Sequence, residues 1–114
     1  MHELGIAFYI IDDVKEVVEK NNLTQVGSVT IELGEVSGVI PEYLEDVWNW
    51  ACEKHECMKG CKLNILKDEA VTFCEDCHET YPTVKYGKEC PYCHSGNTYL
   101  VKGNGAVIKE IEAC

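Results

Sequence analysis

The chain has 114 residues, 46% of them hydrophobic, and its formal net charge at neutral pH is −10. This length predicts one domain, or one domain with a small appendage, and the apolar content is sufficient for a core. The acidic balance argues against nucleic acid as a partner, because phosphate binding needs a basic face, and favours cations or a basic protein surface. No apolar run approaches the roughly 18 residues of a membrane span, so we expect none.

The amino-terminal segment, from about residue 2 to residue 20, is predicted to be a helix, because apolar side chains recur at helical spacing. These positions are Leu4, Phe8, Ile11, Val14 and Val18. A half-buried strand should follow at residues 29–33, where apolar and polar residues alternate. After a loop at 34–38, Pro41 opens a second predicted helix, whose apolar face carries Leu44, Val47, Trp48 and Ala51.

The carboxyl-terminal half predicts short strands around a cysteine-rich segment. Leu63 and Ile65 belong to the second predicted strand, residues 99–102 are extended, and a turn at 103–105 leads to a last strand at 107–111. We therefore predict an α+β fold with a small three-stranded sheet, two helices and an inserted zinc-ribbon-like module with four cysteines. The predicted α+β domain covers residues 1–69 and 101–114, and the predicted module covers 70–100.

Four cysteines occur in two close pairs, Cys74-x2-Cys77 and Cys90-x2-Cys93, separated by twelve residues. Two such knuckles can present four thiolates to one tetrahedral ion, so the spacing predicts a zinc site. A closed site of this kind normally folds a small domain and performs no chemistry. Because the segment is poor in aliphatic residues, we expect its folding to need the metal.

Other uses of the pairs remain open. The second pair also resembles the knuckles of rubredoxin-type iron sites, and a Cys-x-x-Cys pair can be a redox dithiol. A histidine follows each pair, at His78 and His94, and either could serve as an alternate zinc ligand. Cys-x-x-Cys-His is also a haem-attachment pattern, but the amino terminus lacks the features of a signal for export, and we expect a reduced cytoplasmic protein.

The chain begins Met1-His2-Glu3. The amine of Met1, the backbone nitrogen of His2 and its imidazole can close two adjacent chelate rings on one metal ion, and Glu3 could add an oxygen. A nitrogen-rich, near-square arrangement of this kind suits Ni(II) or Cu(II).

A second group of potential ligands surrounds the end of the second predicted helix. It consists of Cys52, His55, Cys57 and Cys61, and Cys114 ends the chain. Either these residues form another metal or redox site, or they are buried and exposed thiols without such a role.

Three stretches together resemble one known family. Met1-His2-Glu3-Leu4, the segment 31–42 (IELGEVSGVIPE) and the two cysteine pairs are similar to the HypA/HybF nickel-insertion accessory proteins of nickel–iron hydrogenase maturation. The resemblance spans nearly the whole chain. It implies a nickel metallochaperone that is not an enzyme, with nickel bound through His2 together with the Met1 amine and Glu3. It also implies Zn(II) bound by the four paired cysteines.

The resemblance further implies partners and a possible change of ligands. The expected partners are a nickel-handling GTPase and the large subunit of a hydrogenase, or urease in some organisms, and we include a homodimer. In some relatives the histidines that match His78 and His94 exchange with cysteines at the zinc. Gly5 and the run 105–109 depart from the usual family pattern without touching a proposed ligand. The alternatives are a zinc-ribbon interaction module without metal transfer and a small thiol redox protein.

Overall fold

The computed structural model describes residues 3–114, and these residues form two compact units. The first unit comprises the described part of Met1–Glu32 together with Val39–Leu66 and Ala106–Cys114. The second unit comprises Leu33–Gly38 and Lys67–Gly105. The second unit therefore includes the loop 33–38, which the sequence analysis places with the first domain.

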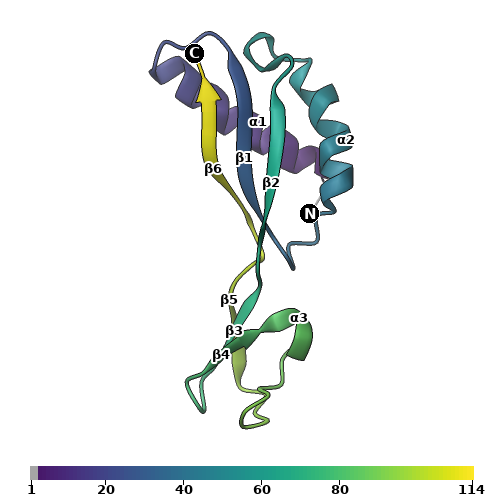
Figure 1. Cartoon of the computed structure of the whole chain (residues 1–114), viewed down its shortest axis with the longest axis vertical. Helices are drawn as coiled ribbons and strands as arrows, with labels where there is room; N and C mark the ends of the chain where they lie inside the picture. Colours follow the sequence, from purple (N-terminus) through teal and green to yellow (C-terminus); the bar gives the residue numbers. More distant parts are fainter. Residues whose placement is uncertain (1–2) are drawn as a thin grey trace. The chain divides into compact units, whose positions relative to one another are not determined.

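The first unit is a three-stranded sheet with two helices, as predicted (Figure 1). The strands are β1 (Val26–Gly34), β2 (Lys62–Asp68) and β6 (Ala106–Ala113), in the order β2-β1-β6. Helices α1 (Glu3–Lys20) and α2 (Pro41–Cys52) lie together on one face of this sheet. None of the helices among residues 3–114 is long and apolar enough to cross a membrane.

The core of the first unit is aliphatic. Helix α1 buries Ile6, Ala7, Ile10, Ile11, Val14 and Val18, and the central strand buries Val26, Val29 and Ile31. At the first turn of α1 the apolar stripe differs from the predicted one, since Leu4 is 37% exposed and Ile6 and Ala7 are buried instead. The small side chain of Ala7 permits close packing at this turn. The buried face of the helix therefore includes Ile6 and Ala7, and Leu4 lies at its edge.

Helix α2 begins with Pro41 in its first turn, as predicted, and buries Leu44, Trp48, Ala51 and Cys52. Proline favours this position because the first turn of a helix needs no donor from its backbone nitrogen. A short 3-10 helix, η1 (Glu56–Met58), then leads toward β2.

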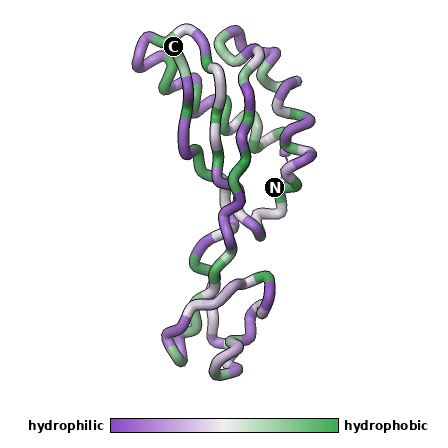
Figure 2. Tube along the Cα trace, in the orientation of Figure 1, coloured by the Kyte–Doolittle hydropathy of each residue, from purple (hydrophilic) through white to green (hydrophobic). Residues whose placement is uncertain are grey.

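The second unit has its own sheet, with the order β4-β3-β5 and antiparallel pairing. Its elements are β3 (Val71–Cys74), β4 (Thr80–Pro82), the short helix α3 (Thr83–Tyr86) and β5 (Thr98–Lys102). Of these the sequence indicated only the extended run at 99–102. In Figure 2 this unit is largely hydrophilic, and its buried cluster consists of Cys74, Tyr81 and Cys90, with Cys77 packed against them.

Backbone contacts explain why the loop 33–38 belongs to the second unit. The Val36 N–H donates to Gly103 O at 2.8 Å, and the Glu35 N–H donates to Asp68 O at 2.9 Å. Gly103 has a φ of 102°, and a Cβ atom there would lie 2.4 Å from the Cα of Ala70. Only glycine accommodates both the left-handed backbone and this close approach.

Candidate metal centre

The structure brings the four paired cysteines together. The sulfur atoms of Cys74, Cys77, Cys90 and Cys93 all lie within 4.8 Å of one another. The shortest contacts join the two pairs, with 3.5 Å between Cys74 and Cys93 and 3.6 Å between Cys77 and Cys90. These contacts leave the sulfurs at the corners of a small cage whose size and donor type fit a tetrahedral metal ion such as zinc.

The two pairs sit in backbone turns with the same hydrogen bonds. In the first turn, Cys74 N–H donates to Glu79 O at 2.9 Å, and His78 N–H donates to Cys74 O at 2.9 Å. In the second, Cys90 N–H donates to Ser95 O at 3.0 Å, and His94 N–H donates to Cys90 O at 2.8 Å. The sequence spacing therefore produces two equivalent knuckles that face each other.

Both knuckles end at a histidine with a left-handed backbone. His78 has a φ of 61° and His94 a φ of 62°. For an L-residue this conformation costs roughly 1–2 kcal/mol relative to the ordinary right-handed one. Glycine would avoid that cost, yet histidine occupies both equivalent positions. The His78 ring lies 6.0 Å from the ring of Phe73, centroid to centroid.

Polar side chains join the two knuckles independently of the sulfurs. Asp76, between the first pair of cysteines, accepts a hydrogen bond from the hydroxyl of Ser95. The Glu75 N–H also donates to Asn97 O at 3.0 Å. These residues could not be predicted from the sequence, since a single aspartate, serine or asparagine in a loop carries no recognisable signal. Together they hold the knuckles in register.

Backbone N–H groups and neighbouring thiols determine which sulfur carries negative charge. Burial raises the pKa of Cys90, but N–H groups of Cys93 and Tyr92 and the thiols of Cys77 and Cys93 outweigh it and lower that pKa to about 7. At Cys77 the N–H of Glu79 lowers the pKa, but burial and the other three thiols raise it to about 12. Of the two thiols, Cys90 is therefore the one that loses its proton more readily, and a bound cation would favour deprotonation of its neighbours.

Of the predicted ligands at the amino terminus, the structure describes only Glu3. Met1 and His2 lie outside the described residues. Glu3 is the first residue of α1, and its side chain is half-buried. Its carboxylate lies in the first turn of the helix, where the helix dipole favours negative charge.

The cysteines near the end of α2 do not form a second multi-ligand cluster. Among residues 3–114, the paired cysteines are the one group in which three or more potential metal ligands converge. Cys52 and Cys61 are buried, Cys57 is half-buried, and Cys114 is exposed. The Cys114 backbone pairs with Gln25, so this residue closes the sheet instead of joining the other thiols.

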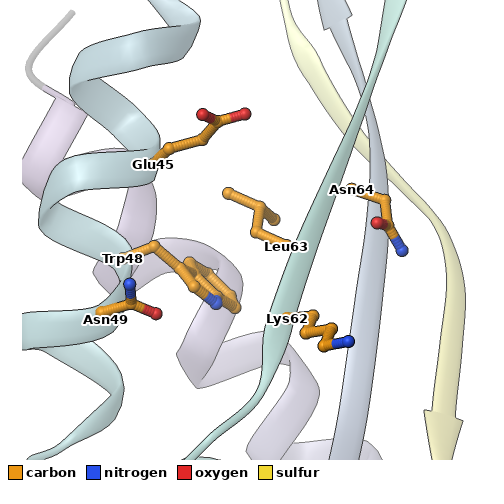
Figure 3. Close-up of a pocket in the computed structure, with 6 residues that line it drawn as sticks. All are labelled: Glu45, Trp48, Asn49, Lys62, Leu63 and Asn64. Atoms are coloured by element: carbon orange, nitrogen blue, oxygen red, sulfur yellow. The ribbon is translucent and has the colours of Figure 1, made fainter.

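The first unit also has a groove of about 260 Å³ between α2 and β2 (Figure 3). Trp48 points from α2 toward β2 in this groove. The remaining lining residues are Glu45, Asn49, Lys62, Leu63 and Asn64. The lining includes one carboxylate and one amine and contains no thiol, hydroxyl or imidazole.

The fold and the sulfur cage together define a small α+β protein with a four-cysteine metal site. A model of the family described as "Hydrogenase/urease nickel incorporation, metallochaperone, hypA" matches residues 1–113. The chain belongs to this HypA family, whose members are metallochaperones of hydrogenase maturation and not enzymes.

Individual relatives and solved structures agree with this assignment. The hydrogenase maturation factor HypA of Chlorobium phaeobacteroides is 34% identical over 111 residues, which are 97% of each chain. The maturation factor HybF of Salmonella typhimurium is 26% identical over 112 residues, or 98% of each chain. The solution structure of the Ni metallochaperone HypA from Helicobacter pylori has the same fold, with a TM-score of 0.79 at 24% identity, covering 99% of this chain and 97% of that one.

The backbone at His94 generates a prediction about stability. His94→Gly should raise the free energy of unfolding of the zinc-loaded protein by up to about 1 kcal/mol, because the relief of left-handed strain exceeds the entropy that glycine adds to the unfolded chain. Guanidinium unfolding measures the change. His94→Ala is the matched control, since it removes the imidazole but keeps Cβ, and it should give no such gain. A glycine variant less stable than the alanine variant would contradict the prediction.

Proposed function

We propose that this protein binds Ni(II) and delivers it to a hydrogenase, or to urease, during assembly of the active site. The observation that carries the proposal is the match of the nickel-incorporation family over residues 1–113, a range that includes Met1-His2-Glu3. The acidic charge of −10 is compatible with handling a cation.

The proposed nickel ligands are at the amino terminus. The Met1 amine, the His2 backbone nitrogen and the His2 imidazole supply adjacent nitrogens, and Glu3 supplies an oxygen. Nickel favours such a near-square nitrogen set, whereas zinc has no preference for it. Because Glu3 begins α1, a helix with a buried aliphatic face, the ligands would adjoin a rigid element.

We assign Zn(II) to Cys74, Cys77, Cys90 and Cys93 as a structural ion. The convergence of four thiols and the N–H groups directed at them support this assignment. An all-cysteine site leaves no open position, so its role would be to fold the second unit and not to carry cargo.

The proposed partners are a nickel-handling GTPase and a hydrogenase large subunit, with a homodimer as a further assembly, and the proposed location is the cytoplasm. These assignments are supported by membership of a hydrogenase maturation family. The alternative function is a zinc-ribbon interaction module that transports no metal.

The zinc assignment predicts that the second unit unfolds without metal. Zinc binding supplies on the order of 10 kcal/mol in small zinc peptides. The buried cluster of two cysteines and Tyr81 cannot replace this energy. Cys74→Ala should therefore lose zinc and the dispersed amide NMR signals of residues 67–105, whereas Cys114→Ala, an exposed control, should keep both. Dispersed signals in metal-free Cys74→Ala would refute the assignment.

If His78 or His94 can replace a cysteine at the zinc, the ligands of the ion should change with conditions. If an imidazole replaces a thiolate, the number of sulfur ligands at zinc should fall when nickel binds. It should also fall when the pH rises from about 6 to 7.5, because only a neutral imidazole can bind the ion. X-ray absorption at the zinc edge counts these ligands. A double variant, His78→Gly with His94→Gly, should retain four sulfurs under all conditions. A constant count of four in the unaltered protein would rule the exchange out.

The nickel proposal predicts a strict need for the free amine. In protein prepared without added residues, nickel binding measured by calorimetry should be tight. Acetylation of the amine, or one extra residue before Met1, should weaken it strongly, because each removes the terminal donor. His2→Ala should abolish tight binding. Affinity should also fall on acidification, as protons compete for an imidazole with a pKa of about 6.5 and an amine near 8.

The matched control is His55→Ala, which removes another histidine of the first unit and should leave nickel affinity unchanged. Zinc content should stay constant in every form. Equal nickel affinity in the acetylated and free proteins would exclude the amino-terminal site, and absence of nickel binding would favour the interaction-module alternative.

A further inference from the structure

Two cysteines of the first unit that play no part in the proposed metal sites lie against each other in its core. Cys52 is the last residue of α2, and Cys61 immediately precedes β2. Each is only 2% exposed. They account for two of the four cysteines outside the knuckles, and neither the nickel nor the zinc proposal uses them.

The backbone between these cysteines fixes their proximity. Three consecutive turns connect them, in which His55 N–H donates to Cys52 O, Met58 N–H to His55 O and Cys61 N–H to Met58 O, each at 3.0 Å. Gly60, with a φ of 76°, permits the last reversal. The turns therefore return the chain to the end of α2.

Trp48 fastens Cys61 to the helix. The indole N–H of Trp48 donates to the carbonyl oxygen of Cys61 at 3.1 Å, in a buried contact. Trp48 and Cys52 are four residues apart, so they lie on the same face of α2 in adjacent turns. Figure 3 shows Trp48 reaching from α2 toward β2. Its hydrogen bond therefore ties the residue before β2 to the helix that ends at Cys52.

The contact between the two thiols differs from that of the knuckle cysteines. The interaction with the Cys52 thiol lowers the pKa of Cys61 although burial opposes the change, and the Cys61 sulfur also lies 3.6 Å from the carbonyl oxygen of Lys62. The same interaction between the thiols, together with burial, raises the pKa of Cys52. No third ligand converges on them among residues 3–114. The pair therefore supplies only two of the four ligands that a tetrahedral zinc site needs.

We propose that Cys52 and Cys61 are a modification site, at which a low-molecular-weight disulfide oxidises the pair to a reversible intrachain disulfide bond. This inference does not depend on nickel transfer. The disulfide would link the end of α2 to the start of β2 and close a loop of ten residues. In a reducing compartment the pair remains a dithiol, and the bond forms when oxidant accumulates.

The reaction proceeds by two exchanges. The Cys61 thiolate attacks one sulfur of the small disulfide RSSR, forms a mixed disulfide with it and expels RS⁻. The Cys52 sulfur then attacks the Cys61 sulfur and expels the second RS⁻. The two protons of the original thiols leave on two molecules of RSH, the protein loses two electrons, and RSSR gains them.

Because both sulfurs are buried, the oxidant enters when the turn at 53–60 opens locally. This turn lies at the surface, where Glu53, Lys54, Glu56, Lys59 and Gly60 are exposed. Gln25 Nε2 donates to Lys59 O of this turn at 2.8 Å, and the Met58 side chain anchors the turn in the core. Opening the turn exposes far less apolar surface than unfolding the unit, so it costs less free energy than global unfolding.

Peptide mapping tests the proposal directly. The zinc-loaded protein is equilibrated with oxidised and reduced glutathione, free thiols are blocked, and the chain is cut with trypsin without reduction. Lys54 and Lys59 separate Cys52, Cys57 and Cys61 into three different peptides. The expected product joins Asn21–Lys54 to Gly60–Lys62, with the loss of two hydrogens, and dithiothreitol should reverse it.

Two further measurements distinguish the site from general thiol oxidation. Cys57→Ser should retain the cross-link, whereas Cys61→Ser should abolish it. The oxidised protein should also unfold at a higher temperature than the reduced protein, because the bond restricts the unfolded chain. The proposal would be overturned if the pair stays reduced while Cys114 is oxidised. It would also be overturned if the cross-link mainly involves the His55–Lys59 peptide, which carries Cys57. Peptide mapping of the protein without substitutions shows either result.

Discussion

The organisation of the second unit depends on the contact among four sulfur atoms. These atoms lie within 4.8 Å of one another, at a distance where four thiolates would repel strongly without a cation between them. The surrounding cluster of buried side chains is small and consists largely of the cysteines themselves. Under the proposed zinc assignment, metal binding and folding of this unit form one equilibrium, in which the ion would replace the aliphatic core that the segment lacks.

The first unit is built on the opposite principle. Its sheet and two helices enclose an aliphatic core with fully buried Ile11, Val14, Ile31 and Leu44, so its stability needs no ion. In this framework α1 begins at Glu3, which is itself one of the proposed nickel ligands. A chelate at the start of a rigid helix can be exposed for transfer while the rest of the fold remains unchanged. The two units thus separate a proposed cargo site from a proposed structural ion.

The cysteines of this short chain lie in three different environments, which favour different chemistry. In the knuckles, backbone N–H groups face the sulfurs and stabilise negative charge, which suits metal binding. At Cys52 and Cys61, two buried thiols contact each other, which suits disulfide exchange. Cys114 is exposed, and its backbone is what contributes to the sheet. The environment of each sulfur, and not the residue type, separates these roles.

The sequence by itself determined the features that depend on local spacing. Two Cys-x-x-Cys pairs predict two knuckles, alternation predicts the central strand, and the helical repeat together with Pro41 predicts the helices, because each pattern is set by neighbours a few residues apart. Residues 1–3 suggest a nickel chelate for the same reason, and that remains a prediction.

Tertiary structure decided what depends on distant segments. The loop 33–38 joins the second unit through backbone bonds to residues 68, 103 and 105, and Gly103 is required by its approach to Ala70. The short strands β3 and β4 exist through pairing with each other and with β5, not through a pattern of their own. Likewise, Cys61 is tied to α2 by the hydrogen bond from the Trp48 indole to its carbonyl oxygen. Such contacts join residues whose separation in sequence carries no periodic signal, so only the folded chain reveals them.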